Sequence, residues 1–344
     1  MKYVLAPLAD YTNAAFRRLC HRLGADLTYT EMVSAAALAH GSSPTRHLLE
    51  LLPGEGPVAC QLFGHNPDEL AFAAREVTAL RRFVSIDLNA GCPMPRIVQG
   101  GDGAAMIRNP QLIHDCLNAI RSETDLPVTL KTRIGPSPDK VMMLELLDVA
   151  ESTGCAGITA HGRFTSQKHG GPVHLDLIAE LVRHARIPVT GNGGISDLPS
   201  AELMAQTGVA AIMIGRAALA NPWLFGDLKT DSEPPSGDVL VRRQNAVFQD
   251  HVANLIELHA QLSRNFPDDH VPALGDYLLG FVRTHLFHYF KGRPGVGEFR
   301  RRLNEIRTLA ELQSAAAPFL AQQMPIIRLP QDRRGGAEES RDCG

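Results

Sequence analysis

The stretch that decides the fold runs from Val128-Thr-Leu-Lys131, through a helix-like segment at Lys140–Ser152, to Gly157-Ile-Thr-Ala-His161. Two short, mostly apolar runs thus flank one amphipathic segment of helical length. This pattern is typical of two parallel strands joined by a helix that covers the sheet. The stretch therefore predicts an α/β unit in which strand and helix alternate.

The same alternation continues in both directions along the first two-thirds of the chain. Eight such units fit an α/β (β/α)8 TIM barrel, which we assign to residues 1–228. An open doubly wound sheet would need a glycine-rich phosphate loop after its first strand, but Ala6-Pro7-Leu8-Ala9-Asp10 stands there. The other predicted strands are Tyr3–Ala6, Leu27–Tyr29, Val58–Leu62, Ser85–Leu88, Pro188–Gly191 and Ala211–Ile214. Further helix-like segments between them include Asp68–Leu80, Pro110–Ser122, Leu175–His184 and Leu198–Thr207. Asn66-Pro67-Asp68 and Asn109-Pro110 resemble helix starts, with proline near the first turn.

The last third of the chain has a different pattern. A polar, proline-containing segment over Lys229–Asp238 predicts a linker. Residues 239–320 lose the strand signal and show helical periodicity, which predicts a second, smaller, all-helical domain. Residues 331–344 lack large apolar side chains, so we expect a disordered tail.

Composition limits the function classes. The formal net charge of −3 gives no general attraction to nucleic acid, although a local basic face remains possible. The 6 cysteines form no C-x-x-C pair, which argues against a zinc site or a disulfide scaffold. No apolar stretch is long enough to span a bilayer, and the N-terminal apolar run is too short for a signal peptide. We expect a cytoplasmic, monomeric protein without metal or membrane partners.

Nearly every predicted strand delivers a polar or glycine-rich group to the end where barrel enzymes carry their chemistry. Glycine-rich turns after the last two strands are suited to a phosphate, with Arg216 as an added charge, although the glycines could also simply make tight turns. Buried Lys131 needs an anion, either a reduced flavin or a rim carboxylate such as Asp87 or Glu31. Gln61 and Asn89 suit the uracil-like edge of a flavin or could satisfy loop backbone, and His161 could bind a cofactor or cap a loop.

Cys92 differs from the other cysteines in its position. It follows a glycine, precedes a proline and lies on a loop just past a predicted strand end. The other cysteines stand mostly in apolar helix-like or strand-like settings, where they read as small core residues. Cys92 is therefore the candidate catalytic thiol.

Taken together, these motifs resemble the tRNA-dihydrouridine synthase family up to about Leu312. Each fragment is weak alone, but their order and spacing are specific. The matching fragments are Ala6-Pro7-Leu8, Phe16–Cys20, Glu31–Ser34, Gln61–Gly64, Asn89-Ala-Gly-Cys-Pro93, Gly103–Met106, Lys131-Thr-Arg-Ile-Gly135, His161-Gly-Arg163, Gly191–Gly193, Ile214–Ala218, Tyr289–Gly292 and Arg300–Leu303.

The resemblance implies a flavin enzyme that reduces uridine in tRNA to dihydrouridine. FMN would deliver a hydride to uracil C6, Cys92 would protonate C5, and NADPH or NADH would supply the reducing equivalents. Hydride addition at C6 builds negative charge toward C5 and the C4 carbonyl of uracil, so a positioned acid is needed. The uracil base must also leave the RNA helical stack to reach a flavin at the barrel mouth. The FMN-binding residues it implies are Pro7, Leu8, Ala9, Gln61, Lys131, His161, Asn192, Gly193, Gly194, Gly215 and Arg216, and we add Asn89.

Basic side chains predict the RNA contacts. The helical domain contains a cluster of basic residues interleaved with aromatic residues. Besides Lys291, Arg300 and Arg301, this cluster includes Arg283, His285, His288, Arg293 and Arg302. We expect Phe281, Phe287, Tyr289 and Phe290 to pack in the core. The predicted RNA-binding residues are Arg96, Arg133, Arg163, Lys291, Arg300 and Arg301.

Four segments depart from the family pattern, one of them, His161–His169, at two residues. Arg96 replaces the usual Lys, Asn13 and Gly194 replace Asp, and Phe164 and His169 stand where Thr and Tyr are typical. None removes a principal catalytic group, but they leave the preferred RNA position open. Two alternatives stay open as well: a dihydropyrimidine- or dihydroorotate-type oxidoreductase, and an RNA-binding protein that has lost the chemistry.

Overall fold

A closed barrel of parallel strands forms most of the protein. The computed structural model describes residues 1–303, 305–308, 311–312 and 314–315. Every strand predicted from the sequence is present, so the predicted barrel is confirmed. The barrel strands are β1 (Lys2–Leu5), β2 (Thr28–Tyr29), β4 (Val58–Phe63), β5 (Ser85–Ala90), β6 (Val128–Arg133), β7 (Gly157–His161), β8 (Val189–Asn192) and β9 (Ala211–Ile214).

The ring closes between the first strand and its two neighbours. The sheet runs in the order β1-β9-β8-β7-β6-β5-β4-β2, and β1 pairs with β9 in parallel. On the other side, Val4 forms a parallel bridge with Leu27, and the Leu5 amide donates to the Leu27 carbonyl at 2.9 Å. All strands therefore point the same way, and their carboxyl ends meet at one rim.

Strand side chains alternate between the barrel interior and the helices. Cys60, Leu62, Ile86 and Leu88 belong to the large core shared with the surrounding helices. Residues one position away point to the opposite face of each strand. Ala59 packs in a separate small cluster with Val4, Ala6, Tyr29 and Met213. Gln61 and Asp87, which face each other in register, share the face of Ala59. The interior of the barrel thus carries polar groups above a small apolar plug.

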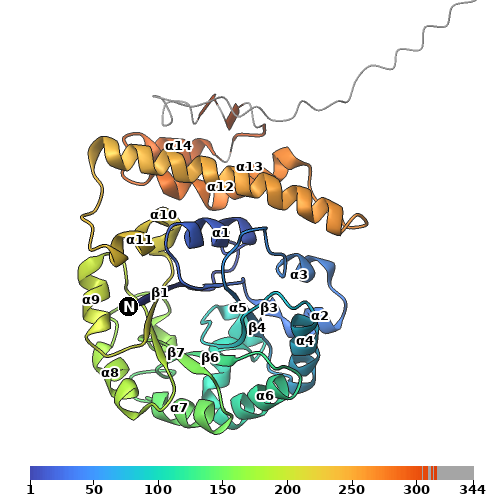
Figure 1. Cartoon of the computed structure of the whole chain (residues 1–344), viewed down its shortest axis with the longest axis vertical. Coiled ribbons are helices and arrows are strands. Elements are labelled where there is room, and N and C mark those ends of the chain that lie inside the picture. The colour runs from blue at the N-terminus through green and yellow to red at the C-terminus, as the bar shows by residue number, and fades with distance from the viewer. Residues whose placement is uncertain (304, 309–310, 313, 316–344) are drawn as a thin grey trace, which may run out of the picture.

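Helices ring the strands (Figure 1). Asn66 and Asn109 cap two of these helices by accepting the amides of Asp68 and Leu112, each with proline at the first turn, as their sequences predict. The helices are α1 (Ala14–Arg22), α4 (Pro67–Ala79), α6 (Pro110–Ser122), α7 (Met143–Ser152), α8 (Leu175–His184), α9 (Leu198–Ala205), α10 (Ala217–Ala220) and α11 (Leu224–Lys229).

Several short elements were not predicted. They lie mainly in the loops at the carboxyl ends of the strands, where a few residues give no full helical or strand period. These elements are β3 (Val33–Ser34), α2 (Ala35–Ala39), α3 (Ser43–His47), α5 (Pro95–Gln99) and the 3₁₀ helices η1 (Gly103–Arg108) and η2 (Thr165–Gln167).

A helical layer lies along one side of the barrel, next to α1, α10 and α11 (Figure 1). It contains α12 (Gly237–Asn265), α13 (Leu274–Thr284), η3 (Leu286–Phe290) and α14 (Val296–Arg302). The helical part of the predicted fold is therefore confirmed for the described residues. The end of the predicted domain, residues 316–320, and the predicted tail, residues 331–344, lie outside them.

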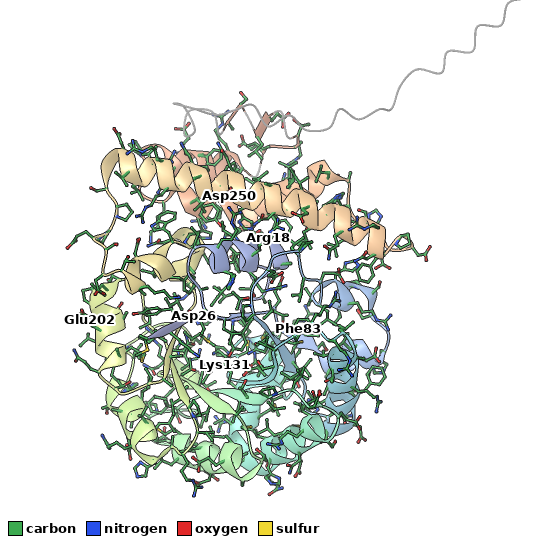
Figure 2. The ribbon with its side chains drawn as sticks, in the orientation of Figure 1. Arg18, Asp26, Phe83, Lys131, Glu202 and Asp250 are labelled. Atoms are coloured by element: carbon green, nitrogen blue, oxygen red, sulfur yellow. The ribbon has the colours of Figure 1, made fainter. Side chains whose placement is uncertain are left out.

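Polar contacts tie this layer to the barrel. The Asn254 side chain donates to the Ala15 carbonyl at 3.0 Å and accepts from Arg18 at 2.6 Å. Figure 2 shows Arg18 at this boundary. The buried Glu50 carboxylate accepts from Gln261 at 2.5 Å and from Asn265 at 2.8 Å. Buried hydrogen bonds of this kind hold the two parts in a defined relative position.

Candidate active site at the carboxyl rim of the barrel

A chain of hydrogen bonds links the barrel interior to the Cys92 loop. The Gln61 amide donates to the Asp87 carboxylate at 2.7 Å and accepts from the Asn89 amide at 2.9 Å. The Asn89 side-chain oxygen accepts the backbone N–H groups of Gly91 and Cys92, each at 3.0 Å. Asn89 therefore holds the loop after β5 through its backbone, which is one of the two roles that the sequence left open, whereas the Gln61 side chain contacts Asn89 and Asp87 and not the loop backbone.

Cys92 is the one partly exposed thiol in the described part of the chain. Cys20, Cys60, Cys116 and Cys155 are all buried, whereas Cys92 is intermediate. Burial raises the pKa of the Cys60 thiol to about 12, which keeps such a side chain protonated and unreactive. The separation of Cys92 from the four buried cysteines is confirmed, and Cys343 lies outside the described residues.

Lys131 lies on β6 and points into the barrel (Figure 2). Its ammonium donates to the Asn192 side-chain oxygen at 3.3 Å, and Asn192 in turn donates to the Met213 carbonyl at 2.8 Å. Burial lowers the pKa of Lys131 to about 8, partly offset by the charge of Asp87. No described carboxylate forms an ion pair with this ammonium, so it is available to an anion at the rim.

His161 and the glycine turn after β8 lie beside each other. Gly193 has a φ of +117°, and a Cβ built there would lie 3.2 Å from the His161 ring. The buried Nδ1 of His161 has no hydrogen-bond partner among the described residues. Burial, together with neighbouring cations, lowers the pKa of His161 to about 2, so the ring is neutral. The His161 ring is neutral, lies close to the Gly193 backbone and has a buried nitrogen without a partner among the described residues. These features are consistent with a hydrogen bond from His161 to a bound ligand.

The remaining predicted cofactor residues occupy the same rim. Pro7 and Leu8 follow β1 and are partly buried, and Ala9 is exposed. Gly215 follows β9 and is partly buried, whereas Arg216 is exposed at the start of α10. One guanidinium nitrogen of Arg216 donates to the His169 carbonyl at 3.1 Å. These groups belong to strands that are neighbours in the ring, so the fold brings both glycine turns to one side of the rim.

Two of the predicted RNA-binding arginines are turned into the protein. Arg133 is only 2% exposed and donates to the carbonyls of Gly91 at 2.9 Å and Phe164 at 3.0 Å. Arg163 is 8% exposed and donates to the Gly171 carbonyl at 2.9 Å. This burial does not fit the predicted contact with a solvent-borne phosphate. Both side chains instead brace rim loops, because a buried guanidinium needs acceptors and the loop carbonyls supply them.

The other predicted RNA-binding residues, Arg96, Lys291, Arg300 and Arg301, are exposed. The guanidinium of Arg300 lies 5.0 Å from the centre of the Phe287 ring. Arg283 and Arg293, in contrast, donate to Leu303 and Gln244 within the helical layer. Tyr289 and Phe290 are buried, as expected for core aromatics, and Phe281 and Phe287 pack against the core from partly buried positions.

The structure shows the surroundings of three residues that depart from the family pattern. Asn13 caps α1 by accepting the Phe16 amide at 3.0 Å, a role that Asp also fills. Phe164 is 2% exposed and packs edge-on against His174. Gly194 has a φ of +77°, and a Cβ there would lie 3.0 Å from Val173. An Asp at Gly194 would therefore meet backbone strain and a close contact in this chain.

Two acidic side chains, predicted only as partners for Lys131, also belong to the site. Asp87 lies at the base of the hydrogen-bond chain, and burial raises its pKa to about 6. Glu31 follows β2 and accepts the Asp10 amide at 2.6 Å, and burial raises its pKa to about 7. The sequence signal was available, because Asp87 and Asn89 are two positions apart in one strand, between the apolar residues Ile86, Leu88 and Ala90, and must share one face of it.

The described residues contain no cluster of three or more His, Cys, Asp or Glu side chains suited to a metal ion. Within the same described part, no helix is both long and apolar enough to cross a membrane.

Comparison with known proteins agrees with this arrangement. Residues 4–324 match the family model for dihydrouridine synthase. A probable tRNA-dihydrouridine synthase of Mycobacterium tuberculosis (strain ATCC 25618 / H37Rv) is 34% identical over 325 residues, covering 90% of this chain and 79% of that protein.

Two relatives named tRNA-dihydrouridine synthase B are similarly close. The one from Shewanella oneidensis is 31% identical over 315 residues, covering 90% of this chain and 92% of the relative. The one from Yersinia pestis is 32% identical over 317 residues, covering 92% of this chain and 95% of the relative. The family match spans both the barrel and the helical layer, and on this basis the chain belongs to the dihydrouridine synthase family.

Proposed function

We propose that this protein is a tRNA-dihydrouridine synthase that uses FMN and NADPH, or NADH, to reduce the C5–C6 double bond of uridine. The observation that carries the proposal is the Cys92 loop. The loop presents a partly exposed thiol at the rim of a parallel barrel, and Asn89 holds the backbone of Cys92. The family membership supports the same reaction.

The rim residues fit a flavin mononucleotide. The unpaired Nδ1 of His161, the Lys131 ammonium and the positive-φ turn at Gly193 and Gly194 offer a polar contact, a cation and close backbone approach. When bound, FMN supplies the hydride that adds to uracil C6. Pro7, Leu8, Ala9, Gln61, Asn192, Gly215 and Arg216 complete the proposed binding set.

The protein's own groups handle the charge and the proton. Hydride addition at C6 leaves negative charge on C5 and on the C4 carbonyl, so an acid placed at C5 lowers the barrier. Cys92 is the proposed acid, because among the described cysteines its thiol is the one that is partly exposed, on the loop that follows β5 at the rim. The Arg133 guanidinium, bound to the Gly91 carbonyl, keeps the loop in place.

The substrate is proposed to contact the exposed basic side chains. Lys291, Arg300 and Arg301 form what we call the basic helical surface. Arg96 lies on α5, four residues after Cys92. The helical segment, residues 239–320, is the proposed RNA-binding domain beside the catalytic barrel, residues 1–228. Since tRNA is the proposed substrate, we propose a cytoplasmic enzyme, and we propose that it acts as a monomer.

The decisive experiment measures dihydrouridine by nucleoside mass spectrometry in tRNA that lacks the modification, after incubation with protein, FMN and NADPH. New dihydrouridine is the expected result. A yellow protein that oxidises NADPH without forming product would point to another RNA or to a small pyrimidine. A colourless protein that binds tRNA without forming product would point to a binding function.

A further inference from the structure

A buried carboxylate stands at the start of the hydrogen-bond chain that reaches Cys92. Asp87, Gln61 and Asn89 lie on the interior face of β4 and β5 and are 0%, 0% and 5% exposed. We propose that Asp87 is a positioning residue that orients the amides of Gln61 and Asn89 and thereby holds the Cys92 backbone where the thiol acts. The inference rests on the proposed function, in which Cys92 donates the proton.

The two ends of the chain require the same direction of hydrogen bonding. At the loop end, the backbone N–H groups of Gly91 and Cys92 can only donate, so the Asn89 oxygen must face them. The Asn89 nitrogen then needs an acceptor, which is the Gln61 oxygen at 2.9 Å. The Gln61 nitrogen consequently faces the Asp87 carboxylate at 2.7 Å, and an ionised carboxylate can only accept.

Without an acceptor at position 87 this direction is no longer enforced. A side-chain amide can rotate and exchange its oxygen and nitrogen, which reverses donor and acceptor along the chain. If Gln61 turned, its nitrogen would face the nitrogen of Asn89, and Asn89 would have to release either Gln61 or the loop. Because all three side chains are buried, water is not available to replace the broken hydrogen bonds.

The loop is sensitive to such a change because the other residues that hold it bind different atoms. Arg133 donates to the Gly91 carbonyl, and the Ala104 amide donates to the Cys92 carbonyl at 3.0 Å. The N–H groups of the same two residues are held by Asn89. Without the Asn89 hydrogen bonds, the Gly91 and Cys92 peptides can tilt about their carbonyl groups, which displaces the thiol.

Asp87 also has contacts outside this chain. Thr129 donates its hydroxyl to the second carboxylate oxygen at 2.5 Å, and Lys131 contributes an electrostatic attraction. A test must therefore separate the hydrogen-bond acceptor of Asp87 from its charge. Asp87→Asn keeps an acceptor oxygen and removes the charge, whereas Asp87→Leu removes both in a side chain of similar size.

Two half-reactions report on different parts of the site. Reduction of the FMN-loaded enzyme by NADPH does not use Cys92, whereas product formation by the pre-reduced enzyme on unmodified tRNA does. In Asp87→Leu we expect product formation to slow on the order of 10- to 100-fold, the loss typical of a misplaced reacting group. In Asp87→Asn we expect product formation near the wild-type rate.

A readout independent of turnover is the alkylation of Cys92 by iodoacetamide, followed by peptide mass spectrometry. Asp87→Leu is expected to label Cys92 faster than the wild type, because a looser loop exposes the thiol, and Asp87→Asn is expected to match the wild type. If Asp87→Leu fails to fold, Asp87→Ala removes the same acceptor with a smaller side chain, and the slower product formation and faster labelling are then expected in that variant.

The outcomes separate the two proposals. Equal slowing in Asp87→Asn and Asp87→Leu would overturn the inference, since it would assign the effect to the charge. Wild-type product formation and labelling in folded Asp87→Leu would overturn it as well. A wild-type protein that forms no dihydrouridine, or a Cys92→Ala variant that forms it normally, would instead refute the proposed function.

Discussion

The glycine turn after β8 offers a quantitative test of the candidate site. Gly193 has a φ of +117°, a conformation that residues with a Cβ rarely adopt. The added methyl group of Gly193→Ala would lie 3.2 Å from Cε1 and 3.4 Å from Nε2 of His161. The substitution therefore strains the backbone and forces the His161 ring to move by a few tenths of an ångström.

The expected loss follows from this geometry. A non-glycine residue in such a region lowers the free energy of unfolding by about 1–3 kcal/mol. For the barrel this corresponds to a fall in melting temperature of about 2–4 °C per kcal/mol. Since His161 belongs to the proposed FMN site, the affinity for FMN should fall as well.

Gly215→Ala is the matched control. Gly215 has no such positive φ, and its added Cβ would meet Ala6 and Leu8 at ordinary distances of 3.7 Å and 3.8 Å. We expect its free energy of unfolding to stay within about 0.5 kcal/mol of the wild type. Urea unfolding followed by circular dichroism and FMN titration by flavin fluorescence measure the two effects. Equal free energies of unfolding for the two variants would refute the strain argument. Unchanged FMN affinity in Gly193→Ala would show that the turn at Gly193 does not contribute to FMN binding.

Three further predictions concern the proton donor, the Lys131 ammonium and the RNA surface. Cys92→Ala should retain FMN and NADPH oxidation but lose dihydrouridine formation; product at the wild-type rate would remove Cys92 from the mechanism. Lys131 has a pKa lowered to about 8, so it is charged below that pH and neutral above it. The affinity for FMN should fall as pH rises through this range, and Lys131→Met should abolish that pH dependence in a fluorescence titration. The double variant Arg300→Ala/Arg301→Ala should weaken tRNA binding and reduce the slope of log affinity against log salt by about 1 for each phosphate interaction removed. A slope equal to that of the wild type would show that these two arginines of the basic helical surface do not contact tRNA phosphates.

The sequence alone was enough for the barrel, the helical layer and the special position of Cys92. These features depend on local signals: apolar runs of strand length, amphipathic segments between them, and asparagine–proline helix starts that the structure reproduces at Asn66 and Asn109. Because parallel strands end at one rim, a residue just past a strand is placed near the others without knowledge of distances. The resemblance to the dihydrouridine synthase family, made from motif order, is confirmed by the family match.

Other features were decided only by the tertiary structure. Arg133 and Lys291 are both basic in sequence, yet Arg133 is buried among loop carbonyls and Lys291 is exposed. Asp87 and Gln61 are 26 residues apart and meet because β4 and β5 pair in a register that no local pattern specifies. Burial and hydrogen-bond partners arise from contacts between distant segments. Local sequence therefore predicts which residues lie at the carboxyl rim of the barrel. Only the packed fold determines which of them are exposed, which are buried and hydrogen-bonded to loop carbonyls, and which residues hold the Cys92 loop.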